Sequence, residues 1–135
     1  MTRNGPDDAT RKGSVETAEI EGLLAFAATR RGKARLNVMS EAIAKCRALV
    51  RKSPGQHEVL LAHCLRTSSR MLLDERRLTQ ALPAAQEAVA LTRRCGGPPL
   101  AAALMCLGNV LEALNRFSEA AAAMAEADAV IGKSD

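Results

Sequence analysis

The sequence predicts an all-α domain. Of its 135 residues, 47% are hydrophobic, alanine and leucine dominate, β-branched residues are few and proline occurs only five times. This composition is typical of helical proteins. Apolar residues recur three or four positions apart through most of the chain, as on one face of a helix. A chain of this length makes about one domain.

The helices are expected in order along residues 14–135, after a disordered tail at 1–13 that lacks apolar residues able to anchor it. Ser14 is a suitable N-cap for the first helix, which the basic segment 30–33 ends. The second helix carries an amphipathic stripe from Met39 to Val50, and Ser53-Pro54-Gly55 stops it. The third runs from about Gln56 to Leu73. The fourth has Thr79 as N-cap, which would place Pro83 in the first turn.

Residues 104–127 predict the last two helices and the way they pack. One helical face carries an apolar stripe formed by Leu104, Leu107 and Leu111. Asn115-Arg116 interrupts this stripe, and a second apolar stripe begins at Phe117. Two helices joined by so short a loop form an antiparallel hairpin. Gly108 is expected to face the second helix, because a missing Cβ lets two backbones approach closely.

An internal repeat organises the chain. One constant shift along the sequence lays Ala120, Met124, Glu126, Ala127 and Val130 on Ala81, Ala85, Glu87, Ala88 and Leu91, and Gly108 on Ser69. A second shift of the same length gives only a partial match, with Thr29-Arg30 where the last repeat has Leu107-Gly108. The first repeat therefore matches only in its second helix.

The last hairpin resembles a tetratricopeptide repeat (TPR), with Leu104, Leu107-Gly108, Leu111, Phe117, Ala120, Met124 and Ala127 in the order of that family's pattern. The period exceeds the length of about 34 residues that is usual for this family, as in some longer bacterial repeats. The resemblance implies three hairpins, about six helices, stacked as a short right-handed TPR-like solenoid over residues 14–135. It also implies a non-catalytic scaffold or adaptor that binds a protein or peptide.

In such proteins the first helix of each repeat lines a concave groove. The positions that the resemblance places there are His63, Arg66, Arg70, Met105, Asn109, Glu112, Arg31 and Arg35. His63, Arg66 and Arg70 share a helical face by their spacing. Arginine binds carboxylates in bidentate fashion, so the expected ligand is a segment with acidic side chains or a free C-terminus. Asn109 resembles the asparagine that fixes a ligand's backbone in this family. The alternative is that Arg66 and Arg70 are solvated surface charges.

The sequence offers no evidence of catalysis. It contains no nucleophile motif, phosphate-binding loop or zinc spacing, so no enzyme activity, metal or cofactor is expected. Cys46, Cys64, Cys95 and Cys106 lie on or near apolar stripes and are expected to be buried thiols. No apolar run is long enough to cross a membrane and no signal peptide begins the chain, so a cytoplasmic protein is expected.

Two other functions stay open. Residues 1–52 hold eleven Lys/Arg against six Asp/Glu, whereas residues 98–135 hold two against five. Nucleic-acid binding through the basic segment 30–52 is therefore an alternative, although stacking aromatic side chains are nearly lacking. The alanine-rich last helix could also mediate oligomerisation, including a homodimer.

Overall fold

A computed structural model shows an all-helical chain. It describes residues 6–133, with side chains from Val15 onward, and within that range it contains six helices and no strand. These are α1 (Pro6–Ala28), α2 (Gly32–Lys52), α3 (Glu58–Asp74), α4 (Leu78–Thr92), α5 (Gly97–Ala113) and α6 (Phe117–Lys133). The all-α prediction is confirmed.

The first helix begins earlier than the sequence suggested. α1 starts at Pro6, well before the expected N-cap Ser14, so the predicted tail overlaps the helix at residues 6–13. Proline suits the first position of a helix, and acidic residues such as Asp7 and Asp8 suit its first turn. The tail was expected because the segment lacks apolar residues, and that lack does not prevent these residues from starting a helix. Residues 1–5 of the predicted tail lie outside the described residues.

The expected cap of the fourth helix was wrong. α4 begins at Leu78 with Arg77 as the N-cap residue, so Thr79 lies inside the helix and Pro83 lies beyond its first turn. A proline there removes the hydrogen bond that its N–H would make to the carbonyl of Thr79. The helix nevertheless continues, because Ala81 and Ala85 on either side of Pro83 are fully buried against neighbouring helices. Tertiary packing outweighs the local preference.

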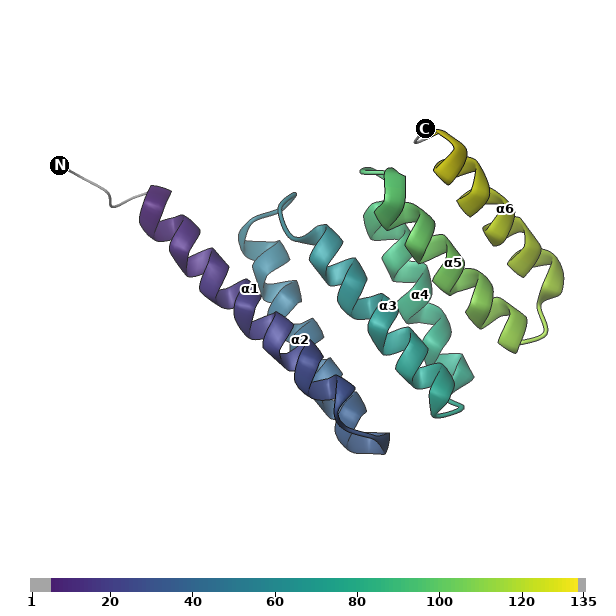
Figure 1. Ribbon diagram of the computed structural model, residues 1–135, viewed down its shortest axis with the longest axis horizontal. Helices are drawn as coiled ribbons and strands as arrows, with labels where there is room; N and C mark the ends of the chain where they lie inside the picture. The colour runs from purple at the N-terminus through teal and green to yellow at the C-terminus, as the bar shows by residue number, and fades with distance from the viewer. Residues whose placement is uncertain (1–5, 134–135) are drawn as a thin grey trace.

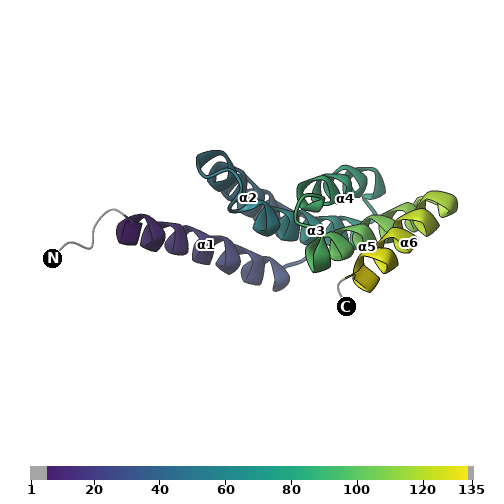
Figure 2. The same cartoon turned by 90° about the horizontal axis from the view of Figure 1, so that it is seen from above.

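Each helix packs against the next one in the chain, and α3 also packs against α5. The helices succeed one another from α1 at one end of the molecule to α6 at the other (Figure 1). Seen from above, α2 and α4 lie on one side of the row that contains α1, α3 and α5 (Figure 2). Within this row α3 and α5 are neighbours, in agreement with their direct packing.

The internal repeat is visible in the helix boundaries. The shift that lays Gly108 on Ser69 also lays the first residue of α5, Gly97, on the first residue of α3, Glu58. It relates the last residues of these two helices and the first residues of α6 and α4 in the same way. The pairs α3–α4 and α5–α6 therefore share the same pattern of helix boundaries.

The turns inside these two pairs agree in detail. Arg76 and Asn115 are related by the same shift and have φ values of 62° and 63°. After each of them an N–H donates to a carbonyl of the preceding helix over 2.8 Å, from Arg77 to Leu72 and from Arg116 to Leu111. This is the Schellman turn that ends many helices.

The contact between the helices of each pair depends on small residues. A Cβ added at Gly108 would lie 2.8 Å from Met124 Cε and 3.1 Å from its Sδ, so Gly108 faces α6 as expected. At the equivalent place in the preceding pair, Ser69 is fully buried and its hydroxyl donates to the carbonyl of Ala81 at 3.0 Å. Gly108 and Met124 of the last pair thus correspond to Ser69 and Ala85 of the preceding pair.

Candidate functional site

A hollow between α3 and α5 brings together four of the residues that the sequence placed in a groove. Its volume is about 210 Å³, and the lining residues are Arg66, Arg70, Ala102, Met105, Cys106 and Asn109. Arg66 and Arg70 come from α3, one turn apart, and Met105 and Asn109 come from α5 with the same spacing. The hollow is formed because α3 packs directly against α5. We call this space the α3–α5 hollow.

Arg66 is an incompletely paired cation in this hollow. Its Nε is buried and has no hydrogen-bond partner, while its Nη2 lies 3.3 Å from His63 Nδ1. Burial lowers the pKa of Arg66, and the nearby Arg70 lowers that pKa further against an opposing effect of Cys106. A guanidinium keeps its charge in proteins, so this environment favours a negatively charged partner.

The arginines elsewhere in the fold make a useful comparison. Four of them, Arg35, Arg47, Arg93 and Arg116, each form an ion pair with a glutamate. Within residues 15–133 the others form no ion pair, namely Arg30, Arg31, Arg51, Arg76, Arg77 and Arg94. Among residues 15–133, no ion pair joins Arg66 or Arg70 to a carboxylate. In particular, Asp74 lies 3.6 Å from Arg35 and forms no ion pair with Arg70. Apart from the contact of Arg66 with His63, the guanidinium groups of Arg66 and Arg70 are thus not paired with a carboxylate of the described residues.

A second hollow lies beside the first and shares Arg70 with it. Its volume is about 380 Å³, and the residues around it are Ala28, Arg35, Thr67, Arg70, Met71, Leu73 and Asp74. It therefore extends the lined surface from α3 toward α1 and α2. We call it the α1–α3 hollow.

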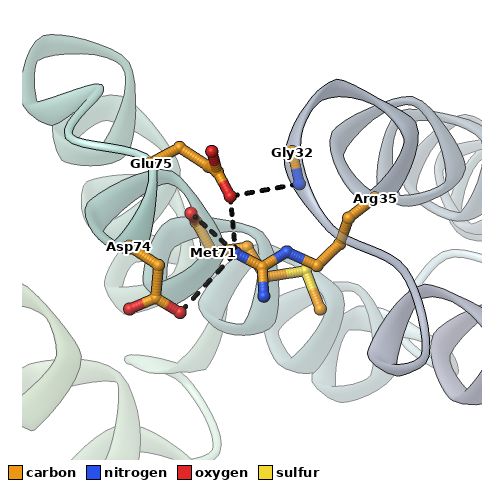
Figure 3. Close-up of polar contacts among 5 residues, drawn as sticks. All are labelled: Gly32, Arg35, Met71, Asp74 and Glu75. Atoms are coloured by element: carbon orange, nitrogen blue, oxygen red, sulfur yellow. Dashed lines mark hydrogen bonds and ion pairs between the residues drawn. The ribbon is translucent and has the colours of Figure 1, made fainter.

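Arg35 lines the α1–α3 hollow but is already engaged (Figure 3). Its Nη2 donates to Glu75 Oε2 at 3.2 Å and to the Met71 carbonyl at 3.3 Å. The same Glu75 oxygen accepts the N–H of Gly32 at 3.2 Å. Because Gly32 opens α2, this carboxylate also neutralises a free donor at a helix N-terminus. Arg35 joins α2 to the end of α3 and is not a free ligand-binding group.

The remaining predicted groove residues lie outside the two hollows. His63 is exposed and contacts Arg66 from the preceding turn of α3. Arg31 is the exposed residue that precedes α2, so it does not continue the face of α1. Glu112 is exposed near the end of α5. The structure thus brings Arg66, Arg70, Met105 and Asn109 together, with His63 beside them, and leaves Arg31 and Glu112 apart.

Glu21 of α1 is a residue that the sequence reasoning missed. It acts electrostatically on His63 and partly offsets the lowering of that histidine's pKa. The repeat pattern could not locate it because the first helix departs from the repeat. Glu21 lies two helical turns before Ala28 and therefore on the same side of α1. Ala28 lines the α1–α3 hollow, so this side of α1 is the one near α3.

Other kinds of site have little support in the described part of the chain. Within it, no group of three or more His, Cys, Asp or Glu residues is arranged to hold a metal ion. Cys46, Cys64 and Cys106 are buried as expected, whereas Cys95 is exposed. Burial raises the pKa of the Cys106 thiol. Among residues 6–133, no helix combines the length and apolar character needed to cross a membrane.

Comparison of the chain with models of known protein families, with curated proteins and with solved structures finds no match. Function must therefore be argued from the site itself.

Proposed function

We propose that this chain is a non-catalytic binding module that captures a protein or peptide segment bearing carboxylates. In this proposal the six helices form three TPR-like hairpins stacked as a short right-handed solenoid. Support comes from the repeat in the helix boundaries and in the turns at Arg76 and Asn115. Support also comes from the packing of each helix on the next and of α3 on α5.

The observation that carries the proposal is the pair of arginines in the α3–α5 hollow. Arg66 and Arg70 line one surface with Met105 and Asn109. Guanidinium groups supply planar, charge-assisted donors for a carboxylate, Asn109 supplies amide groups for a peptide backbone, and Met105 supplies a flexible apolar contact. Met105 is 46% exposed, so its side chain is available to a ligand.

The electrostatics favour this reading over nucleic-acid binding through residues 30–52. Four basic residues of that segment, Arg35, Lys45, Arg47 and Lys52, form ion pairs with Glu75, Glu19, Glu87 and Glu16. A phosphate backbone binds through unneutralised Lys and Arg. Half of the segment's positive charge is therefore opposed within the fold, and the basic excess counted in the sequence overstates what a nucleic acid would meet.

The C-terminal helix stays a candidate for self-association. α6 packs against α5 and exposes Phe117 and Ile131, at 61% and 48%, together with several alanines. A homodimer through this face is compatible with ligand binding between α3 and α5, because the two surfaces lie on different helices.

A peptide-display selection on the immobilised full chain tests the proposed function. We expect enrichment of peptides with clustered acidic residues or an acidic C-terminus. Replacing Arg66 and Arg70 together by Ala should weaken their binding by about 10- to 100-fold, since a hydrogen bond to a charged group contributes about 1.5–3 kcal/mol.

The matched control is Arg51→Ala with Arg94→Ala, which removes the same charge from two exposed residues away from both hollows. Arg93 is unsuitable because it forms an ion pair with Glu126. Equal loss in both double variants would mean general electrostatic attraction and would overturn the proposed site.

A further inference from the structure

His63 and Arg66 form a contact that depends on protonation. Arg66 Nη2 lies 3.3 Å from His63 Nδ1, one helical turn away on α3. A guanidinium can only donate hydrogen bonds, so Nδ1 must accept and must carry no proton. The contact therefore exists only with neutral imidazole, in the tautomer that bears its proton on Nε2. A proton at Nδ1 would place two donors and two positive charges against each other.

The charged groups around His63 come from two helices. His63 is an exposed residue, but partial burial of its ring is still the largest cause that lowers its pKa. Arg66 and Arg70 of α3 lower that pKa further, while Glu21 of α1 opposes them. Cys106 of α5 lies against the same arginine, with its Sγ 3.9 Å from the Arg66 carbonyl. In the free protein the balance of these groups favours the neutral ring that the Arg66 contact requires.

A bound carboxylate would change that balance. It would occupy the donors of Arg66 and Arg70 and neutralise the charges that act on His63. The ring could then accept a proton and become a third cation beside the ligand. This step moves one proton from solvent to His63 and changes no covalent bond between heavy atoms.

We propose that His63 is a proton-responsive positioning residue, which holds Arg66 through Nδ1 when neutral and supports a bound carboxylate as a third cation when protonated. Ligand binding would be coupled to uptake of a proton, and affinity would rise as the pH falls. This inference rests on the proposed function, because it concerns the same site. It adds the condition under which the site binds most tightly.

The sign of the coupling follows from linkage. The ligand raises the pKa of His63, so the complex holds more protons than the free protein in the interval between the two pKa values. Affinity must then increase as pH falls through that interval, and it is constant above it. An acidic peptide keeps its aspartates ionised at pH 5.5, because their ordinary pKa is about 3.9.

Proton NMR of the two histidines tests the proposal directly. The chain contains only His57 and His63, so the His57 ring serves as an internal control. The probe is an N-acetylated peptide of five aspartates, added to the full chain at constant ionic strength. We expect the titration of His63 to move to higher pH with the peptide, whereas the peptide should leave the His57 signals unchanged. We also expect binding about three- to tenfold tighter at pH 5.5 than at pH 8, where a tenfold change corresponds to one pKa unit.

Two variants separate the possible causes. His63→Gln keeps an acceptor for Arg66 but cannot gain a charge, so it should bind as the wild type does at pH 8 and lose the increase at pH 5.5. His57→Gln should keep the increase. Binding of the peptide without any movement of the His63 titration would overturn this inference and leave the proposed function intact. Failure of the peptide to bind at either pH would overturn both.

Discussion

Replacing Gly108 by Leu tests the packing of the last two helices. Even a Cβ at this position would lie 2.8 Å from Met124 Cε and 3.1 Å from Met124 Cγ. A leucine would add three more carbons to that contact, and overpacking of this kind costs about 1–3 kcal/mol. Leucine also gains about 0.8 kcal/mol over glycine in helix propensity. The net loss of unfolding free energy should therefore be about 0.2–2.2 kcal/mol.

Thermal melting and urea unfolding, both followed by circular dichroism, measure this loss. For a chain of this size it corresponds to a fall in Tm of about 1–8 °C. Gly22→Leu is the matched control, because a Cβ there meets nothing within 4 Å and only the propensity gain remains. The double variant Gly108→Ser, Met124→Ala copies Ser69 and Ala85 of the preceding pair. It should lose less unfolding free energy than Gly108→Leu. An unchanged or higher Tm for Gly108→Leu would refute the assigned contact of α5 with α6.

Three further predictions concern other parts of the chain. Glu75→Ala removes the acceptor shared by Gly32 and Arg35 and should lower the unfolding free energy by about 1–2 kcal/mol. The control Glu112→Ala, at an exposed position, should change the unfolding free energy little. Similar melting of both variants would contradict the role of Glu75. Pro83→Ala should raise the unfolding free energy by about 2 kcal/mol, since proline inside a helix costs about 3 kcal/mol and its rigidity returns about 0.4–1 kcal/mol. A lower Tm would show instead that the proline ring packs favourably. Random duplex DNA should not be retained by the protein at physiological salt in a filter-binding assay, and a tight, salt-resistant complex would contradict the peptide-binding proposal.

The sequence predicted the helices well where periodicity and a repeat agreed. The shift that laid Gly108 on Ser69 reappears in the boundaries of α3 and α5 and in the turns at Arg76 and Asn115. Asparagine tolerates the left-handed conformation at such a turn, so Asn115 was an informative signal. Arg76 gave none, because arginine has no preference for that conformation.

The sequence failed where local signals compete. Pro6, Asp7 and Asp8 are typical both of a turn and of a helix start, and Pro83 lies inside a helix because buried Ala81 and Ala85 outweigh its local cost. In the site, helical spacing placed Arg66 and Arg70 on one face, and the hollow contains both. The role of Arg35 depends on Glu75, far away in the sequence, and no spacing rule reveals such a contact.

Mapping of a bound peptide by NMR tests the central proposal most directly. The amide and methyl signals of the full chain are followed while an acidic peptide from the display selection is added. The proposal predicts that the changes concentrate on α3 and α5 around Arg66, Arg70, Met105 and Asn109, and that they vanish in the Arg66→Ala, Arg70→Ala variant. Changes centred on α2 or α6, with the signals of Arg70 and Asn109 unmoved, would contradict it.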